Sequence, residues 1–185
     1  MCNIESDKLL NIGAEAYRAG DYQTAEKYYQ KSAKMGNSQA ACNLGYIFEF
    51  GRTGPRNYEK AFYWFKKSAD AGNANACYKV GDFYLYVKSI ERDSNLAFEY
   101  YQSAVEIVEN SEQDDDIKSD IYYRIALCGH KGYGVEQNDL VAFKYINDAE
   151  FYSYCDRFAG KFMWQSVYNK IEKLRDEILS NLNNQ

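Results

Sequence analysis

Residues 57–73, NYEKAFYWFKKSADAGN, are the stretch that decides the fold. The stretch begins at Asn57, whose side-chain oxygen can accept the free amide hydrogens of a first helical turn, and it ends near Gly72, a typical helix stop. Between these signals lie Ala61, the pair Trp64-Phe65 and Ser68. Spacings of three, four and seven residues place such positions on one helical face. The stretch therefore predicts an amphipathic helix with a defined start, packing face and end.

The same pattern occurs four times along the chain. Its first small residue recurs at intervals of 36, 36 and 45 residues, as Ala25, Ala61, Ala97 and Ala142. A helix-capping residue stands four positions earlier each time, as Asp21, Asn57, Asp93 and Asn138. The bulky pairs are Tyr28-Tyr29, Trp64-Phe65, Tyr100-Tyr101 and Tyr145-Ile146, and the second small residues are Ser32, Ser68, Ala104 and Ala149. A fixed period of this kind indicates a repeat architecture.

Each of these helices is preceded by a second helical stretch. Its middle carries a small residue, in turn Gly13, Gly45, Gly81 and Ala126. Glycine inside a helix costs about 1 kcal/mol in propensity, so its presence indicates close helix packing. We expect four antiparallel helix pairs and a last helix in a single repeat domain over residues 1–185. The units are predicted at about 7–37, 38–73, 74–116 and 117–155, and the C-terminal helix at about 157–182.

These residues resemble the Sel-one-like repeat, a relative of the tetratricopeptide repeat. The resemblance is carried by Leu44-Gly45, Phe48 and Gly51, by residues 57–73, and by Gly132-Tyr133-Gly134-Val135 with Asn138 and Ala142. The first unit resembles a plain tetratricopeptide repeat in Gly13, Gly20-Asp21-Tyr22, Ala25 and Tyr28-Tyr29. Together the matches cover roughly residues 8 to 150. The resemblance implies an all-α fold, a right-handed α/α superhelix (solenoid) whose concave groove binds peptides or partner domains.

Three segments depart from the repeat. Val87-Lys88-Ser89-Ile90 replaces the glycine-rich turn in the third unit, and extra residues around 110–116 precede the fourth. A stripe of Ile171, Leu174, Ile178 and Leu182 marks the last helix. A repeat stack needs a capping element at its end, which is the role expected for this helix. A dimer contact or a partner-binding helix is the alternative.

Composition limits the possible partners. The chain has 185 residues, a net charge of −5 and no basic block, so neither nucleic acid nor an anionic membrane is expected as a partner. No apolar run approaches the ~20 residues of a membrane helix, and the N-terminus shows no signal peptide. A cytoplasmic location is therefore expected, with export through a leader outside this sequence left open.

The cysteines form neither a disulfide framework nor a metal site by spacing. No C-x-x-C pair occurs, and the chain has one histidine, which argues against a zinc site. We expect no metal and no cofactor. The thiols are expected to be reduced and to act as small core residues, and they are Cys2, Cys42, Cys77, Cys128 and Cys155.

No catalytic residue is predicted. His130 has no serine, cysteine or carboxylate neighbour at a catalytic spacing, so a surface position is expected for it. The acidic run 112–116 lacks the glycine and ligand spacing of a calcium loop. A cell-wall or β-lactam hydrolase, of the kind linked to cysteine-rich Sel-one-like proteins, remains the enzymatic alternative. A self-associating structural module is another. The chain lacks both regularly paired cysteines and a Ser-x-x-Lys sequence, which disfavours the hydrolase.

The favoured function is that of a scaffold or adaptor that binds another protein, as an extended segment or a helix, while itself being a monomer or weak dimer. Geometry carried over from the resemblance places the groove on the first helix of each pair. The predicted partner-binding residues are Asn43, Tyr46, Glu49, Phe50, Lys79, Asp82, Tyr86, Arg124, His130 and Lys131. They mix aromatic side chains with both signs of charge, as interface residues often do, and all are expected to be exposed.

Overall fold

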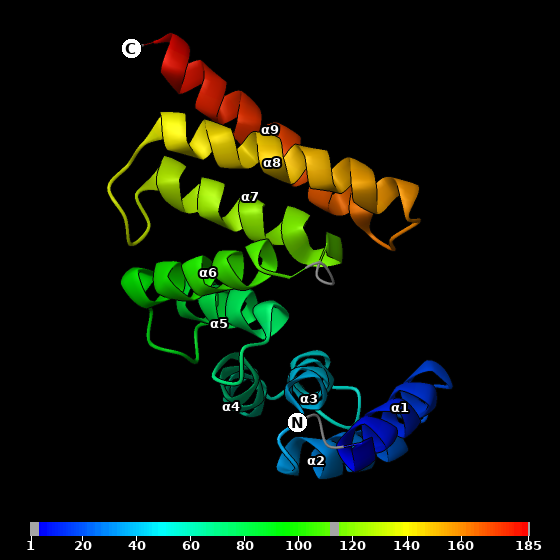
Figure 1. Cartoon of the computed structure of the whole chain (residues 1–185). Helices are drawn as coiled ribbons and strands as arrows, with labels where there is room; N and C mark the ends of the chain where they lie inside the picture. The colour runs from blue at the N-terminus through cyan, green and yellow to red at the C-terminus, as the bar shows by residue number, and fades with distance from the viewer. Residues whose placement is uncertain (1–3, 112–114, 185) are drawn as a thin grey trace. The chain divides into compact units, whose positions relative to one another are not determined.

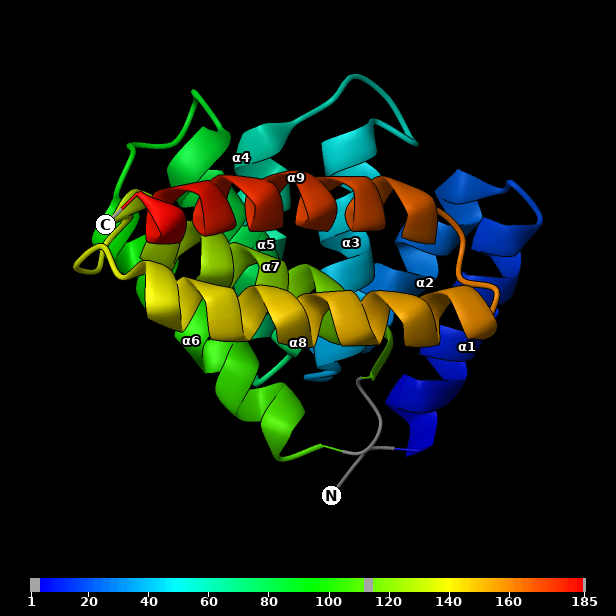
Figure 2. The same cartoon turned by 90° about the horizontal axis from the view of Figure 1, so that it is seen from above.

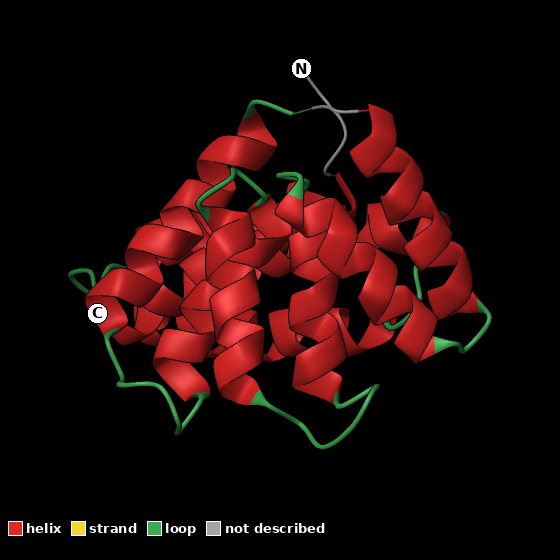
Figure 3. Ribbon diagram, turned by 90° about the horizontal axis from the view of Figure 1, so that it is seen from below, coloured by secondary structure: helices red, strands yellow, loops and turns green. Residues whose placement is uncertain are grey.

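A computed structural model describes residues 4–111 and 115–184 of the chain, and this part contains nine α-helices and no strand (Figure 3). The chain divides into two compact units, Met1–Arg92 and Asp93–Gln185, and each is described by itself. The predicted all-α class, with neighbouring helices packed against one another, is confirmed. The single domain over residues 1–185 stays a prediction.

The first unit holds five helices, which Figure 1 shows in blue to blue-green. They are α1 (Ile4–Arg18), α2 (Tyr22–Lys34), α3 (Ser38–Phe50), α4 (Tyr58–Ala69) and α5 (Ala74–Tyr86). Within this unit α1 packs on α2 and α3 packs on α4, while α2 also contacts α3 and α4 contacts α5. Two helix hairpins and the first helix of a third pair therefore form this unit.

The predicted helix starts are confirmed in both units. Asp21, Asn57, Asp93 and Asn138 each accept a hydrogen bond from a backbone amide three residues on, at 2.8–3.0 Å. Asn37 and Asn73 cap α3 and α5 in the same way, at 2.9 Å. The chain leaves α2 and α4 through Gly36 and Gly72, whose φ angles of 93° and 81° favour glycine.

A ring from the second helix of a pair lies against a glycine of the first. A Cβ atom added to Gly45 would lie 2.5 Å from the ring of Phe65, and one added to Gly13 would lie 2.7 Å from the ring of Tyr29. Both rings are buried. The two helices of each hairpin approach this closely because no side chain stands at the glycine.

Hydrogen bonds of the same type recur in the two hairpins. The hydroxyl groups of Ser32 and Ser68, near the ends of α2 and α4, donate to the backbone carbonyls of Ser6 and Ser38 at 2.7 Å. The capping residue Asn37 also donates to Asp7 at 2.9 Å. Asn73 donates to Gln39 at 3.1 Å. The serine joins the two helices of one pair, and the asparagine joins consecutive pairs.

The second unit holds four helices, α6 (Ser94–Glu109), α7 (Asp115–Lys131), α8 (Asp139–Phe158) and α9 (Trp164–Asn183). Figures 1 and 2 show α7, α8 and α9 stacked side by side, and α8 contacts both of the others. The stripe of Ile171, Leu174 and Ile178 is buried on this stack, as the sequence predicted. The last helix therefore covers α8 and reaches α7.

Two boundaries differ from the sequence-based expectation. The fourth unit, expected to end near residue 155, continues as α8 to Phe158, and the last helix begins at Trp164 rather than near 157. No glycine or proline interrupts residues 139–159, and the chain turns only at Gly160, whose φ is 67°. The departure in the third unit is confirmed, since α5 ends at Tyr86 and is followed by Val87 in an extended conformation rather than by a glycine turn. Residues 112–114 of the acidic run lie outside the described residues.

The described cysteines lie in the core, as the sequence predicted, except for Cys155. Cys42, Cys77 and Cys128 are buried thiols that form no disulfide, whereas Cys155 is exposed. Cys2 lies outside the described residues. Burial raises the pKa of the Cys42 thiol to about 12 and that of Cys77 to about 11. The thiolate form of both residues is therefore scarce at neutral pH.

Phe65 should contribute more to the stability of the α3–α4 hairpin than its neighbour Trp64 does. Phe65→Ala is expected to lower the free energy of unfolding by about 3–5 kcal/mol, because Phe65 is fully buried against Gly45. Trp64 is only partly buried, so Trp64→Ala should lower the free energy of unfolding by less. Urea unfolding followed by circular dichroism would compare the two variants. A larger effect at Trp64 would contradict the packing described.

Thiol reactivity should separate the cysteines. At pH 8, Cys155 should react with Ellman's reagent within seconds to minutes, whereas Cys42 and Cys77 should react only after unfolding, since burial both shields them and raises their pKa. The experiment is made on a Cys2→Ser variant, because Cys2 lies outside the described residues. Mass spectrometry of the labelled peptides would identify the modified positions. Rapid labelling of Cys42 in the native protein would contradict its burial.

Candidate functional site

Side chains of α3 and α5 form a connected polar network in the first unit. The hydroxyl of Tyr46 donates to Oδ1 of Asn75 at 2.5 Å, and the hydroxyl of Tyr78 lies 3.2 Å from that of Tyr46. Since the Tyr46 proton is used on Asn75, Tyr78 donates to Tyr46. Burial raises the pKa of Tyr46 well above its ordinary value, with the neighbouring Tyr78 as the next cause. Tyr46 therefore remains a neutral, fixed donor.

An ion pair joins the same two helices. Nζ of Lys79 lies 2.7 Å from Oε1 of Glu49, and the two side chains are only 13% and 16% exposed. The Lys79 ammonium also lies 5.5 Å from the ring centre of Tyr46 and 5.6 Å from that of Phe65. Contacts of this kind attract a cation to the ring face. The predicted residues Tyr46, Glu49 and Lys79 are thus brought together, but as a mostly buried cluster rather than as exposed side chains.

An aromatic and cationic edge borders this cluster. Phe50 stacks on Tyr46 with ring centres 5.8 Å apart and is 47% exposed. The guanidinium of Arg52 lies 5.6 Å from the ring centre of Phe50 and 5.3 Å from that of Tyr22. Tyr17 meets Tyr22 edge to face at 5.1 Å. We call Tyr22, Tyr46, Glu49, Phe50, Arg52, Asn75, Tyr78 and Lys79 the α3–α5 face.

The remaining predicted residues of this unit lie near the face. Asn43 accepts a hydrogen bond from Gln39 at 3.0 Å, one turn before Tyr46. Asp82 is partly buried on α5, and Tyr86, at the end of α5, is 58% exposed. Sequence reasoning missed Asn75, Tyr78 and Arg52, although Asn75 stands one helical turn before Lys79.

In the second unit, Arg124 and Lys131 are held by carboxylates. Arg124 donates to the backbone carbonyl of Asp120 at 2.8 Å and lies 3.3 Å from its Oδ1, with 17% of its side chain exposed. Lys131 lies 2.8 Å from Oε2 of Glu177 on α9, and this bond lowers the pKa of Glu177. The positive charges of Arg124 and Lys131 are therefore already paired with carboxylates of the second unit.

The expected surface position of His130 is wrong. Its side chain is 4% exposed, and its Nδ1 lies 2.5 Å from Oδ1 of Asp139, the first residue of α8. The expectation that no carboxylate stands near it is wrong as well, because the α7–α8 turn folds Asp139 back onto the end of α7. Since the carboxylate only accepts, Nδ1 carries the hydrogen. Nε2 faces Oε2 of Glu177 at 3.7 Å, and Asn181 donates to Oδ2 of Asp139 at 3.2 Å.

This cluster joins three helices of the second unit. Its members come from α7, α8 and α9, and both contacts of His130 are made with carboxylates. A histidine whose two nitrogens face carboxylates has no nucleophile to activate, so the arrangement acts as a polar clamp on α9. Across residues 4–111 and 115–184 no group of acidic, cysteine and histidine side chains is arranged to hold a metal ion. No described helix is long and apolar enough to cross a bilayer.

The repeated hairpin matches a known sequence family. The Sel1 repeat matches residues 10–37, 38–73, 74–106 and 119–147. The chain belongs to the Sel1 repeat family. Members of this family generally act as scaffolds for protein–protein interaction.

The chain is also similar to two curated proteins and to solved structures. Over 49 residues the chain is 43% identical to the proteins named DAP3-binding cell death enhancer 1 of Rattus norvegicus and Mus musculus; this is 26% of the chain and 10% of each relative. The chain thus spans about a tenth of those relatives. A Sel1 repeat protein from Oxalobacter formigenes aligns over 91% of this chain and 73% of its own, with a TM-score of 0.66 and 22% identity.

A protective antigen of uropathogenic Escherichia coli with an SLR fold aligns over 95% of this chain and 53% of its own, with a TM-score of 0.52 and 17% identity. At these identities the solved structures show the fold alone. The repeated caps, glycines and buried rings lie at positions that carry the repeat resemblance, whereas Glu49, Lys79 and His130 lie outside those positions.

The His130 clamp should stabilise the second unit. Asp139→Asn removes the carboxylate that accepts from His130 and Asn181, and it is expected to lower the free energy of unfolding by about 1.5–3 kcal/mol. Asp176→Asn is the matched control, since Asp176 is an exposed acid beside the clamp with little expected effect. Urea unfolding of both variants would test this, and equal effects would contradict the clamp.

Proposed function

We propose that this Sel1 repeat chain is a protein-interaction scaffold that holds a segment of its partner against the α3–α5 face. The observation that carries the proposal is the pairing of fixed polar groups with exposed aromatic ones on that face. Tyr46, Glu49 and Lys79 are held by hydrogen bonds and an ion pair, while Phe50 and Arg52 are exposed beside them.

A surface of this kind loses little freedom when it binds. Ordering a flexible side chain at an interface costs about 0.5–1.5 kcal/mol, and the side chains of the α3–α5 face are already ordered by one another. Tyrosine and arginine are also the residues that most often dominate binding energy. The stacked set of Tyr22, Arg52 and Phe50 would thus serve as the anchor, with Tyr86 adding a further exposed ring.

The relatives give independent support. The rat and mouse proteins that share 49 residues with this chain carry names that describe binding to another protein, DAP3. The proposal extends only the class of activity, binding of a protein, to this chain. A scaffold or adaptor role follows from that class, and a partner presenting an extended segment or a helix would suit a face built from two parallel first helices of the repeat.

Because Tyr46 and Lys79 are partly or mostly buried, substitutions of these two residues are poor tests of partner binding. Lys79→Glu would place a second carboxylate beside Glu49 in a mostly buried position, and loss of one partner of such a pair costs several kcal/mol. Tyr46→Ala would remove a partly buried ring. Loss of binding by either variant would therefore report folding as much as recognition, and exposed residues of the same face are the better choice.

The proposal predicts that Phe50→Ala with Arg52→Ala lowers partner recovery at least tenfold without changing the melting temperature, since both side chains are exposed. The control pair is Tyr63→Ala with Lys34→Ala, an exposed ring and an exposed cation of the same unit. Quantitative pull-down from lysate of the source organism, read by mass spectrometry, measures both. Equal recovery by the two pairs would remove the face from the proposal.

A photo-crosslinking amino acid at position 86 provides a direct complement. Tyr86 is exposed at the end of α5, so a benzoylphenylalanine there should attach to the partner that the Phe50 and Arg52 variant loses. The same group at position 63, on α4, should not. Failure of the wild-type chain to recover any protein in either assay would reject the scaffold function itself.

A further inference from the structure

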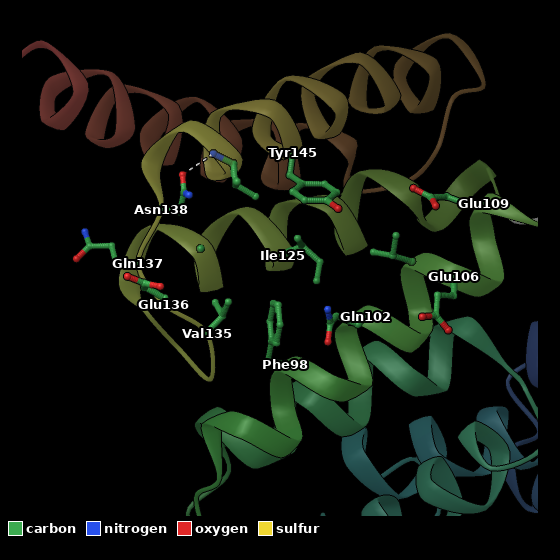
Figure 4. Close-up of a pocket in the computed structure, with 13 residues that line it drawn as sticks. Phe98, Gln102, Glu106, Glu109, Ile125, Val135, Glu136, Gln137, Asn138 and Tyr145 are labelled. Atoms are coloured by element: carbon green, nitrogen blue, oxygen red, sulfur yellow. Dashed lines mark hydrogen bonds between the residues drawn. The ribbon is translucent and has the colours of Figure 1, made fainter.

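A cleft in the second unit shares no residue with the α3–α5 face. Its volume is about 580 Å³, and it opens between α6, the α7–α8 loop and the start of α8, with α7 as its floor (Figure 4). The lining residues are Phe98, Gln102, Val105, Glu106, Glu109, Ile125, Gly129, Val135, Glu136, Gln137, Asn138, Val141 and Tyr145. Figure 4 shows Phe98 and Gln102 of α6 facing Ile125 and Tyr145 across the opening.

The floor of the cleft is apolar and has room for a side chain. Val105 and Ile125 are buried there, and Phe98 stands beside them. Gly129 adds no side chain to the floor, and a Cβ atom there would be in ordinary contact with Ala142 at 3.5 Å. An inserted apolar side chain would therefore replace water against hydrocarbon, which is favourable.

The rim of the cleft is acidic. Glu106 and Glu109 stand on α6 and Glu136 on the opposite loop, all three exposed, and none forms an ion pair with a described residue. No lysine or arginine lines the cleft. Lys144, which is outside the lining, lies 5.6 Å from the ring centre of Tyr145. The lining of the cleft thus carries three carboxylates and no lysine or arginine.

The electrostatic field in the wall of the cleft is negative, as it is at the rim. Tyr122 stacks on the lining residue Tyr145 with ring centres 6.1 Å apart. The pKa of Tyr122 is raised to about 12, first by burial and then by the charge of Glu109, with Asp148 also contributing. The carboxylates of Glu109 and Asp148 therefore oppose further negative charge at Tyr122, beside the lining residue Tyr145.

We propose that this cleft binds a segment of another protein that presents a leucine-sized or phenylalanine-sized side chain flanked by arginine or lysine. The apolar floor takes the side chain, and Glu106, Glu109 and Glu136 pair with the flanking cations. The cleft falls in the size range of about 300–1,000 Å³ typical of ligand sites. Its rim residues are exposed and stand on one open side, which suits a chain segment laid across it better than an enclosed small molecule. The site stands whether or not the α3–α5 face binds a partner.

The probe is a fluorescein-labelled peptide with two leucines and one phenylalanine on one helical face and four arginines around them. Its binding to the full chain is measured by fluorescence anisotropy at ~0.15 M salt, where charges more than about 8 Å apart are largely screened. A second peptide replaces the arginines by glutamate, and a third replaces the three apolar residues by serine. Both changes are expected to weaken binding at least tenfold.

Two matched pairs of variants test the cleft itself. Glu106→Lys should raise the Kd at least tenfold, whereas Glu99→Lys, an exposed glutamate two turns away on the same helix and outside the lining, should change it less than threefold. Val141→Trp fills the cleft without changing charge and should also raise the Kd at least tenfold. Leu140→Trp changes the adjacent exposed residue, outside the lining, and should leave the Kd unchanged.

Circular dichroism melts of the four variants keep folding separate from binding. The proposal is overturned if Glu106→Lys and Glu99→Lys act alike, if Val141→Trp binds as the wild type does, or if the glutamate peptide binds as well as the arginine peptide. Spermine that displaces the probe while the serine-substituted peptide still binds would also overturn it, because the site would then recognise charge alone. The Phe50 and Arg52 variant should bind the probe normally.

Discussion

The contact of a ring with a glycine sets the spacing on which the rest of the structure depends. Phe65 lies where a Cβ of Gly45 would stand, and Tyr29 lies in the same way on Gly13. Because the ring and the missing side chain fit each other, the two helices of a hairpin can approach closely and bury the small residues Ala61 and Ala25 completely. The serine and asparagine bonds then fix how the hairpin is closed and how the next one begins.

This packing also positions the candidate site. Tyr46 and Glu49 follow Gly45 by one and four residues, so they project from the side of α3 beside the packed one, where α5 offers Asn75, Tyr78 and Lys79. Residues that the repeat does not need for packing can vary there without changing the hairpin. The fold is thus shared with other Sel1 repeat proteins, while the function depends on the side chains that the fold carries at sites such as the α3–α5 face.

Much of the fold could be predicted from the sequence because its signals are local and recur. Asp21 and Asn57 each accept a hydrogen bond from the backbone amide three residues later. The buried rings Tyr29 and Phe65 follow these caps at the same separation in sequence. The misses arise where contacts join distant positions. His130 meets Asp139 because a loop turns back, and Lys79 meets Glu49 across two helices thirty residues apart. Neither pair recurs with the period of the repeat, so the sequence does not predict that His130 and Lys79 are buried. The cleft of the second unit likewise depends on three separate segments.

The asparagine bonds have a consequence for how such a chain can lengthen. Asn37 caps α3 and also reaches Asp7, and 36 residues later Asn73 caps α5 and reaches Gln39. A tandem duplication of one 36-residue stretch would copy the donor and its acceptor together, in register, along with the serine that closes the hairpin. A single in-frame event in the gene can therefore supply a new repeat complete with its own joints, and growth of the array needs no compensating change elsewhere.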